Sequence, residues 1–288
     1  MLKGLWCQAL VPGVASCKLQ HLAPGRGEIM IRGIYSSAMG MNVQSARLET
    51  VSNNLANVST PGFKKDHVLV QSFPHLIQLS TRRPDSLPGA WQREVLGVTG
   101  AGAAVSQVVT NFSQGSLRET GNPANLALTG SGYFVLTDPE NEDAIFYSRN
   151  GSFQVDSEGY LVNDHGYRLM GDGGPVQLEE DPVNFTVDES GNITENGTVS
   201  NTIYVVDFEN PSNLQREGRD FYRAGEQEPQ PVETPALVQR YLEGANVDLV
   251  EETVNLTTAS RAYETGQKII QAQDGMLGMA INSVGKLR

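Results

Sequence analysis

Apolar residues recur at seven-residue spacing near the start of the chain. The members of this series are Ile34, Met41, Leu48 and Leu55. This spacing places the four side chains on one face of an α-helix. Pro61 and Gly62 end the helical pattern, because proline lacks an amide donor and glycine favours a turn. The pattern predicts an N-terminal helical segment within residues 30–63.

A second series with the same spacing lies near the other end of the chain. Its members are Leu249, Leu256, Tyr263, Ile270, Leu277 and Val284. The positions that would complete a two-stranded coiled-coil seam are polar: Thr253, Ser260, Gln267 and Asp274. The stripe instead broadens towards the C-terminus, which indicates more than one packing neighbour, although a helix covering a globular core would also fit. We predict a C-terminal helical segment within residues 242–288, with Asn246 as its N-cap.

Between these segments the periodicity changes to that of β-strands. Short runs such as YFVL, AIFYS, SFQVD and YRLM alternate with turn sequences such as RNG, SEG and DHG. We therefore predict an antiparallel β domain over residues 100–208. The stretches on either side, residues 64–99 and 209–241, are rich in proline and polar residues and are predicted to be a connector and a linker.

The predicted fold class is α+β, with a central antiparallel β domain. The N- and C-terminal helices can meet only if the chain folds back on itself, and we expect them to pair in a coiled-coil-like rod domain. Residues 1–29 contain the only two cysteines, Cys7 and Cys17, and are predicted to be an extension. Their apolar run resembles a secretory or lipoprotein signal, but Pro12 and Gly13 interrupt it, and translation from Met30 is the favoured alternative.

Composition excludes several classes of function. The formal net charge is -12 and no long basic run occurs, which argues against nucleic-acid binding. No apolar run is long enough for a transmembrane helix, so we expect no membrane insertion. The histidines stand far apart, and neither a catalytic nor a nucleotide-binding motif is complete, so we expect no enzyme activity, no metal and no cofactor.

The ends of the chain resemble a known family. The segment NNLANVSTPGFK, from Asn53 to Lys64, is similar to the N-terminal signature of the bacterial flagellar rod and hook proteins. The sequence FSQGSLRETGNPANLALTGSGYFVL resembles the β core of the basal-body rod members, the FlgF/FlgG group. LVQRYLEGANVDLVEETVNLTTASRAYETGQKIIQAQDGML resembles the family's C-terminal helix.

This resemblance implies a structural subunit of the flagellar basal-body rod, located in the basal body of the cell envelope. It implies that the terminal helices line an inner tube while the β domain faces outward. The implied partners are further copies of this chain, other rod and hook subunits, and the flagellar export apparatus. A proximal rod, a distal rod and a hook-related member all remain open.

Three asparagines in the signature need an explanation, because asparagine is a poor residue for a helix interior. Asn53, Asn54 and Asn57 are predicted to form hydrogen bonds that select one register between subunits, as buried asparagines do in coiled coils. Together with the two apolar series they form the expected assembly surface. The alternative function is a secreted or lipid-anchored β-domain binding module, with Cys17 as the residue that would carry the lipid.

Overall fold

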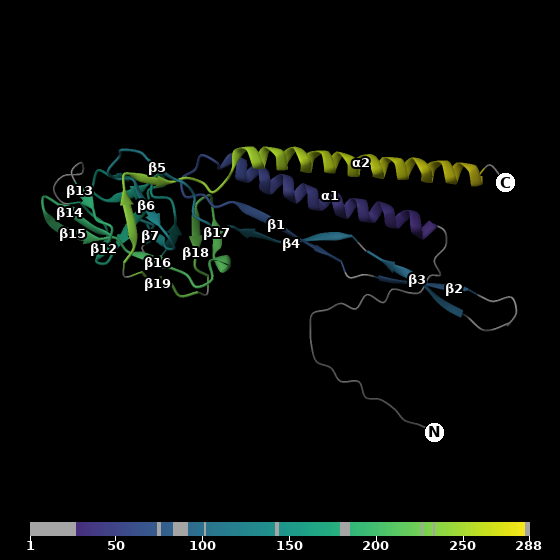
Figure 1. The fold of residues 1–288 in the computed structure, drawn as a ribbon, viewed down its shortest axis with the longest axis horizontal. Helices are drawn as coiled ribbons and strands as arrows, with labels where there is room; N and C mark the ends of the chain where they lie inside the picture. Colours follow the sequence, from purple (N-terminus) through teal and green to yellow (C-terminus); the bar gives the residue numbers. More distant parts are fainter. Residues whose placement is uncertain are drawn as a thin grey trace, which may run out of the picture.

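The computed structural model describes residues 27–73, 76–82, 92–100, 102–141, 144–178, 185–225, 227–232 and 234–285. Two long helices lie side by side at one end of the molecule, and most of the strands form a β domain at the other end (Figure 1). The predicted α+β class is confirmed, with one helix from each end of the sequence and an antiparallel β domain between them. The expectations for residues 1–26 lie outside the described residues.

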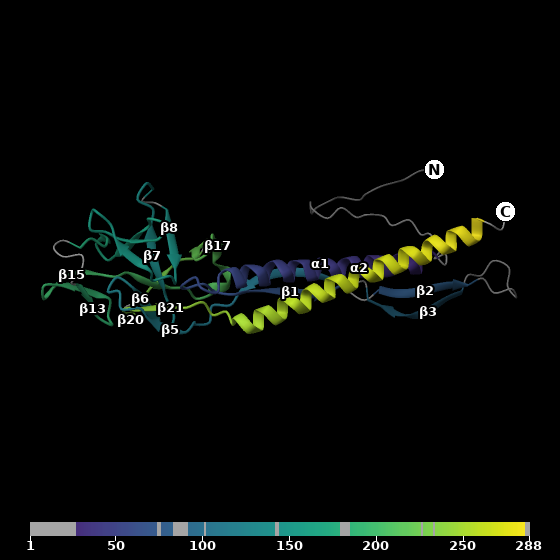
Figure 2. The ribbon, with the colours of Figure 1, turned by 90° about the horizontal axis from the view of Figure 1, so that it is seen from above.

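The two helices are antiparallel. Helix α1 covers Gly27–Ala56 and helix α2 covers Leu249–Gly285. At 1.5 Å per residue their lengths are about 45 Å and about 55 Å. The helices pack along much of α1 and cross at an angle, and α2 continues past the beginning of α1 (Figure 2). None of the described helices has the length and hydropathy needed to span a bilayer.

Strand β1 (Asp66–Ser72) leaves the end of α1 and pairs with β4 (Ala103–Thr110) along the same helix (Figure 1). Farther out, β2 (Leu76–Arg82) pairs with β3 (Gln92–Thr99). The described residues within 64–99 therefore hold three strands, which differs from the expected connector. Strand β1 was missed because it pairs with the distant strand β4, and β2 and β3 were missed because the proline and arginine residues between them resemble those of a linker.

The β domain consists of short antiparallel strands. They are β5 (Leu117–Glu119), β6 (Leu126–Thr129), β7 (Tyr133–Thr137), β8 (Ile145–Ser148), β9 (Phe153–Val155), β10 (Leu161–Asn163), β11 (Arg168–Gly171), β12 (Gly174–Pro175), β13 (Phe185–Val187), β14 (Asn192–Glu195), β15 (Thr198–Thr202), β16 (Val205–Asp207), β17 (Gln215–Glu217), β18 (Phe221–Arg223), β19 (Gln230–Pro231), β20 (Ala236–Gln239) and β21 (Tyr241–Glu243). The main sheet has the order β17-β18-β8-β7-β11-β10-β9.

Residues 209–241 also differ from the expected linker, because they complete the β domain. Strand β18 pairs with β8 of the main sheet, and β20 pairs with β6. The next strand, β21, pairs with β5, so the segment predicted as the C-terminal helix begins in a strand and α2 starts only at Leu249. Strands of three or four residues leave too short a pattern to be distinguished from a polar connection.

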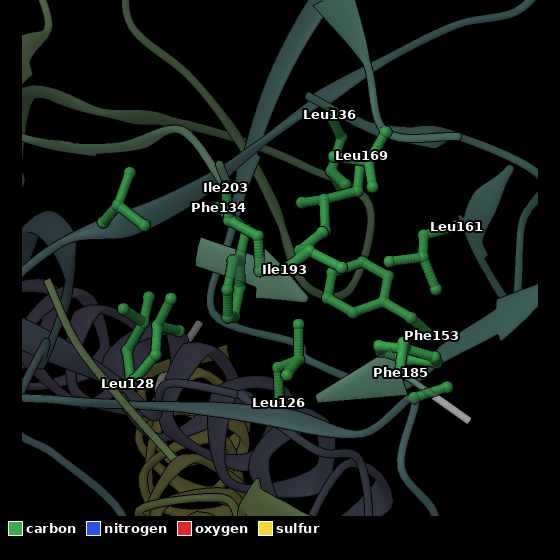
Figure 3. Packing of buried hydrophobic residues seen from close by; sticks show 14 of the residues in the cluster. Leu126, Leu128, Phe134, Leu136, Phe153, Leu161, Leu169, Phe185, Ile193 and Ile203 are labelled. Carbon is green, nitrogen blue, oxygen red and sulfur yellow. The ribbon is translucent and has the colours of Figure 1, made fainter. Parts of the chain in front are cut away.

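Strand β7 is buried on both faces, and its alternating side chains enter two hydrophobic clusters. Phe134 and Leu136 belong to the larger cluster, whose side chains converge from several strands (Figure 3). Within it, the rings of Phe134 and Phe153 meet edge to face, with centroids 5.4 Å apart. Tyr133 and Val135 point into the second cluster. This core gives the helices a rigid base.

Candidate assembly interface

The two predicted apolar series lie largely along the line where α1 and α2 meet. Eight of their residues are half-buried: Ile34, Met41, Leu48, Leu55, Leu256, Tyr263, Ile270 and Leu277. Leu249, the first residue of α2, is exposed. Packing within one chain therefore covers these side chains only in part, and the remaining surface is free to contact a neighbour.

Glycines allow the two helices to approach closely. A Cβ atom on Gly266 would lie 2.5 Å from Met41 Cγ, and one on Gly33 would lie 2.6 Å from Gln273 Nε2. Both glycines are thus explained by helix packing. By contrast, a Cβ atom on Gly275 would have no neighbour within 4 Å.

Two glycine substitutions in α2 are expected to differ in their effect on stability. Gly275→Ala should stabilise the subunit by about 1 kcal/mol, because alanine is the better helix former and the added methyl group meets open space. Gly266→Ala should lose that gain, because overpacking against Met41 costs about 1–3 kcal/mol. Thermal unfolding monitored by circular dichroism compares the two variants. An equal rise in Tm for both would contradict the close approach at Gly266.

The face of α2 opposite α1 carries an exposed apolar stripe. Its members are Val250, Val254, Met276 and Met279, and each is at least half exposed. Arg261 and Lys268 lie between the two apolar ends of the stripe and are also exposed. Within the described residues neither cation has an ion pair. We name these six residues the outward face of α2.

The predicted asparagines act mainly within the chain. Asn54 is buried, and its Nδ2 donates to the backbone oxygen of Asp66 at 3.0 Å while its Oδ1 accepts from the Asp66 amide at 3.0 Å. Asn57 is buried and donates through Nδ2 to the Asn53 backbone oxygen at 2.9 Å. Only Asn53 is exposed. These bonds fix the exit from α1, and the predicted hydrogen bonds between subunits stay a prediction.

A group of buried charges joins the helices to the β domain. Lys64 Nζ lies 2.5 Å from Glu243 Oε1 and also donates to the Ser113 backbone oxygen at 2.8 Å. Arg149 Nη1 lies 3.4 Å from Glu243 Oε2. The amide of Gly115 donates to Glu243 Oε1 at 2.8 Å. All three charged side chains are almost fully buried, and we name Lys64, Arg149 and Glu243 the junction triad.

Burial of the junction triad shifts the pKa of its lysine. Removal from water lowers the pKa of Lys64, and the carboxylate of Glu243 opposes this shift. The arrangement is a structural tie, because every polar contact named above is made within the chain. Sequence reasoning recognised Lys64 as part of the signature but missed Glu243 and Arg149. The nearest sequence signal for Glu243 was its place as a charged residue beside Tyr241 and Leu242, which form β21 with it.

A second contact holds the turn after α1. Phe63 is fully buried, and the guanidinium of Arg216 lies over its ring, 4.4 Å from the centroid. Arg216 Nη1 also donates to Asp66 Oδ2 at 2.5 Å, and Thr110 donates to Asp66 Oδ1 at 2.6 Å. Strands β1, β4 and β17 are thereby fixed around one ring. The aromatic residue of the signature therefore acts as an internal anchor.

The prediction of Asn246 as the N-cap of α2 was wrong. The capping oxygen is Asp248 Oδ1, which accepts from the amide of Val250 at 2.8 Å and from that of Glu251 at 3.2 Å. Asn246 instead ties α2 to the exit of α1. Its Oδ1 accepts from the Lys65 amide at 2.7 Å, and its Nδ2 donates to the Asn111 backbone oxygen at 2.7 Å.

The other titratable groups with perturbed pKa values lie in the packed β domain. Burial raises the pKa of the Asp220 carboxyl group, and burial also raises the pKa of the Tyr222 hydroxyl. Asp220 accepts a hydrogen bond from Asn150 Nδ2 at 2.6 Å. No group of three or more His, Cys, Asp or Glu residues within the described residues is arranged to hold a metal ion.

Comparison with known families matches three parts of the chain. The family described as "Flagella basal body rod protein" matches residues 34–64. The "Flagellar hook protein FlgE/F/G D1 domain" matches residues 127–195. The "Flagellar basal body rod FlgEFG protein C-terminal" family matches residues 238–283. These matches cover both helices and much of the β domain.

Curated proteins match over nearly their full lengths. The flagellar hook-basal body complex protein FlhO of Bacillus subtilis (strain 168) is 30% identical over 274 residues, which are 90% of this chain and 100% of that protein. The flagellar basal-body rod protein FlgG of Borreliella burgdorferi is 31% identical over 88% of this chain and 98% of that protein. FlgG of Bacillus subtilis is 28% identical over 88% of this chain and 99% of that protein.

Proposed function

Since this chain belongs to the flagellar basal-body rod family and is a structural subunit of the bacterial flagellar basal body, we propose that it polymerises through its terminal helices into the axial tube of the rod. Its partners in this proposal are further copies of the chain and other rod and hook subunits. The segments within residues 30–63 and 242–288 supply the assembly surface, and the β domain faces outward.

The outward face of α2 carries this proposal. Val250 is 70% exposed, Val254 is 60% exposed and Met279 is 68% exposed, although all three lie on a regular helix. Covering one such side chain is worth about 1.5–3 kcal/mol. Several of them together supply enough free energy to drive association, once the cost of ordering the partners is met.

We propose that the flagellar export apparatus carries the subunit to the growing rod without cleavage of a signal peptide.

We further propose that the subunit has no catalytic activity. The support is that the perturbed acid Asp220 and the perturbed hydroxyl of Tyr222 are buried in packed β structure, where a substrate has no access.

A charged residue on the outward face should prevent rod assembly while the subunit still folds. We expect Val254→Asp to leave the Tm of the purified subunit nearly unchanged, because position 254 is exposed in the single chain. Association should weaken strongly, since the new carboxylate would be buried against apolar surface. The measurement is the number of rods in isolated basal bodies, seen by electron microscopy, together with motility.

The matched control is Val199→Asp, because Val199 is 64% exposed but lies on β15, in the β domain. This variant should assemble normally. Normal rods from the Val254→Asp variant, at wild-type protein level, would contradict the proposed role of α2.

A further inference from the structure

A pocket of about 230 Å³ lies where α1, β1 and the first turns of α2 meet. Its lining includes Arg47 and Asn54 from α1, His67 from β1, and Glu252 and Asn255 from α2. Glu252 is only 2% exposed. Within the described part of the chain its carboxylate has no hydrogen bond and no ion pair.

The Glu252 carboxylate lines the pocket and has no counter-charge within the described part of the chain. Asp66, the other acid in the pocket, already accepts hydrogen bonds from Thr110 and Arg216. Arg47 lines the same pocket but forms no ion pair with Glu252. Because a carboxylate with little access to water is stabilised by a counter-charge, Glu252 is suited to a cation that arrives from outside the chain.

The outward face of α2 carries such a cation. Glu252 and Arg261 are nine residues apart, and at 100° per residue they point in opposite directions from the same helix. Their burial agrees with this geometry, because Glu252 is buried and Arg261 is exposed. Contacts between different surfaces of identical subunits are head-to-tail and can repeat without closing, as an open helical tube requires.

We propose that Arg261 of a second copy enters this pocket and pairs with Glu252, so that the two opposite faces of α2 form one repeating contact. This inference rests on the proposed polymerisation and identifies one contact within it. Arginine fits the pocket because its guanidinium donates to a carboxylate through two hydrogen bonds and is weakly hydrated. Asn255 lines the same space and offers its amide oxygen for one of the remaining donors.

A double-mutant cycle on self-association tests this contact. The purified full chain is followed by sedimentation velocity over a range of concentrations. Glu252→Gln and Arg261→Gln should each weaken association about 10- to 100-fold, because each leaves a buried partner unpaired. The double variant should associate no more weakly than either single variant. In addition, Glu252→Gln should leave the Tm of the subunit unchanged or raise it, since it removes an unpaired charge.

Lys268→Gln is the matched control, because Lys268 is exposed on the same face and its loss changes the net charge equally. Its effect should add to that of Glu252→Gln. Additive effects of Glu252→Gln and Arg261→Gln would overturn the pairing, and so would coupling of Glu252 to Arg47 in an Arg47→Gln cycle. A wild-type chain that stays monomeric at every concentration would overturn the proposed polymerisation as well, whereas association without coupling would overturn only this contact.

Discussion

Replacing Glu243 with alanine is expected to lower the free energy of unfolding by about 3–5 kcal/mol, the usual cost of leaving buried charges unpaired. Glu243 is the only acid among the three members of the junction triad, so its removal leaves Lys64 and Arg149 buried without a counter-charge. It also removes the acceptor for the Gly115 amide. Because the triad joins the exit of α1 to β21, the loss should loosen the helices from the β domain.

Chemical denaturation of the purified subunit measures this effect. The control is Glu217→Ala, which breaks the ion pair between Glu217 and Arg223, whose side chains are about half exposed. An exposed pair is worth about 0–1 kcal/mol, so this variant should stay close to wild type. If Glu243→Ala lost no more stability than Glu217→Ala, the triad would not be the tie that we describe.

Replacing Gly62 with alanine is expected to destabilise the subunit by about 2–6 kcal/mol, the sum of two costs. Gly62 has a φ of 70°, and a strained backbone conformation costs about 1–3 kcal/mol. A Cβ atom would also clash with the backbone nitrogen of Asn150, and overpacking costs about 1–3 kcal/mol. Because the added methyl group would clash with backbone atoms, rotation of a side chain cannot relieve the contact.

Gly121→Ala separates these two costs. Gly121 has a φ of 73°, close to that of Gly62, but a Cβ atom there would have no neighbour within 4 Å. The control should therefore show only the cost of backbone strain. Thermal unfolding of both variants, followed by circular dichroism, gives the comparison. Equal losses of stability would show that the packing of Gly62 against the β domain contributes nothing.

The helices were predictable because their signals are local. Seven-residue spacing marked both of them, and Pro61 with Gly62 marked the end of the first. The end of α1 at Ala56 and the turn after it agree with this reading. The cap of α2 was misplaced by two residues, because Asn246 and Asp248 are both good capping residues and only the structure shows that Asn246 is occupied elsewhere.

The contacts that join the ends to the β domain were not predictable from local patterns. Lys64 and Glu243 are 179 residues apart in sequence, and neither residue alone indicates burial. Several strands within residues 64–99 and 209–241 were missed for the same reason, since β1 pairs with β4, β18 with β8 and β20 with β6. The asparagine hypothesis identified three informative residues, but Asn54 forms its hydrogen bonds within the chain.

Thiol labelling at position 254 tests most directly whether assembly covers the outward face of α2. Val254→Cys would be prepared in a chain whose Cys7 and Cys17 are replaced by serine, with Val199→Cys as the control. We expect Cys at position 254 to react in the free subunit and to be protected in isolated basal bodies, while Cys at position 199 reacts in both. Equal reactivity at position 254 in the free subunit and in the assembled rod would show that assembly leaves the outward face of α2 uncovered.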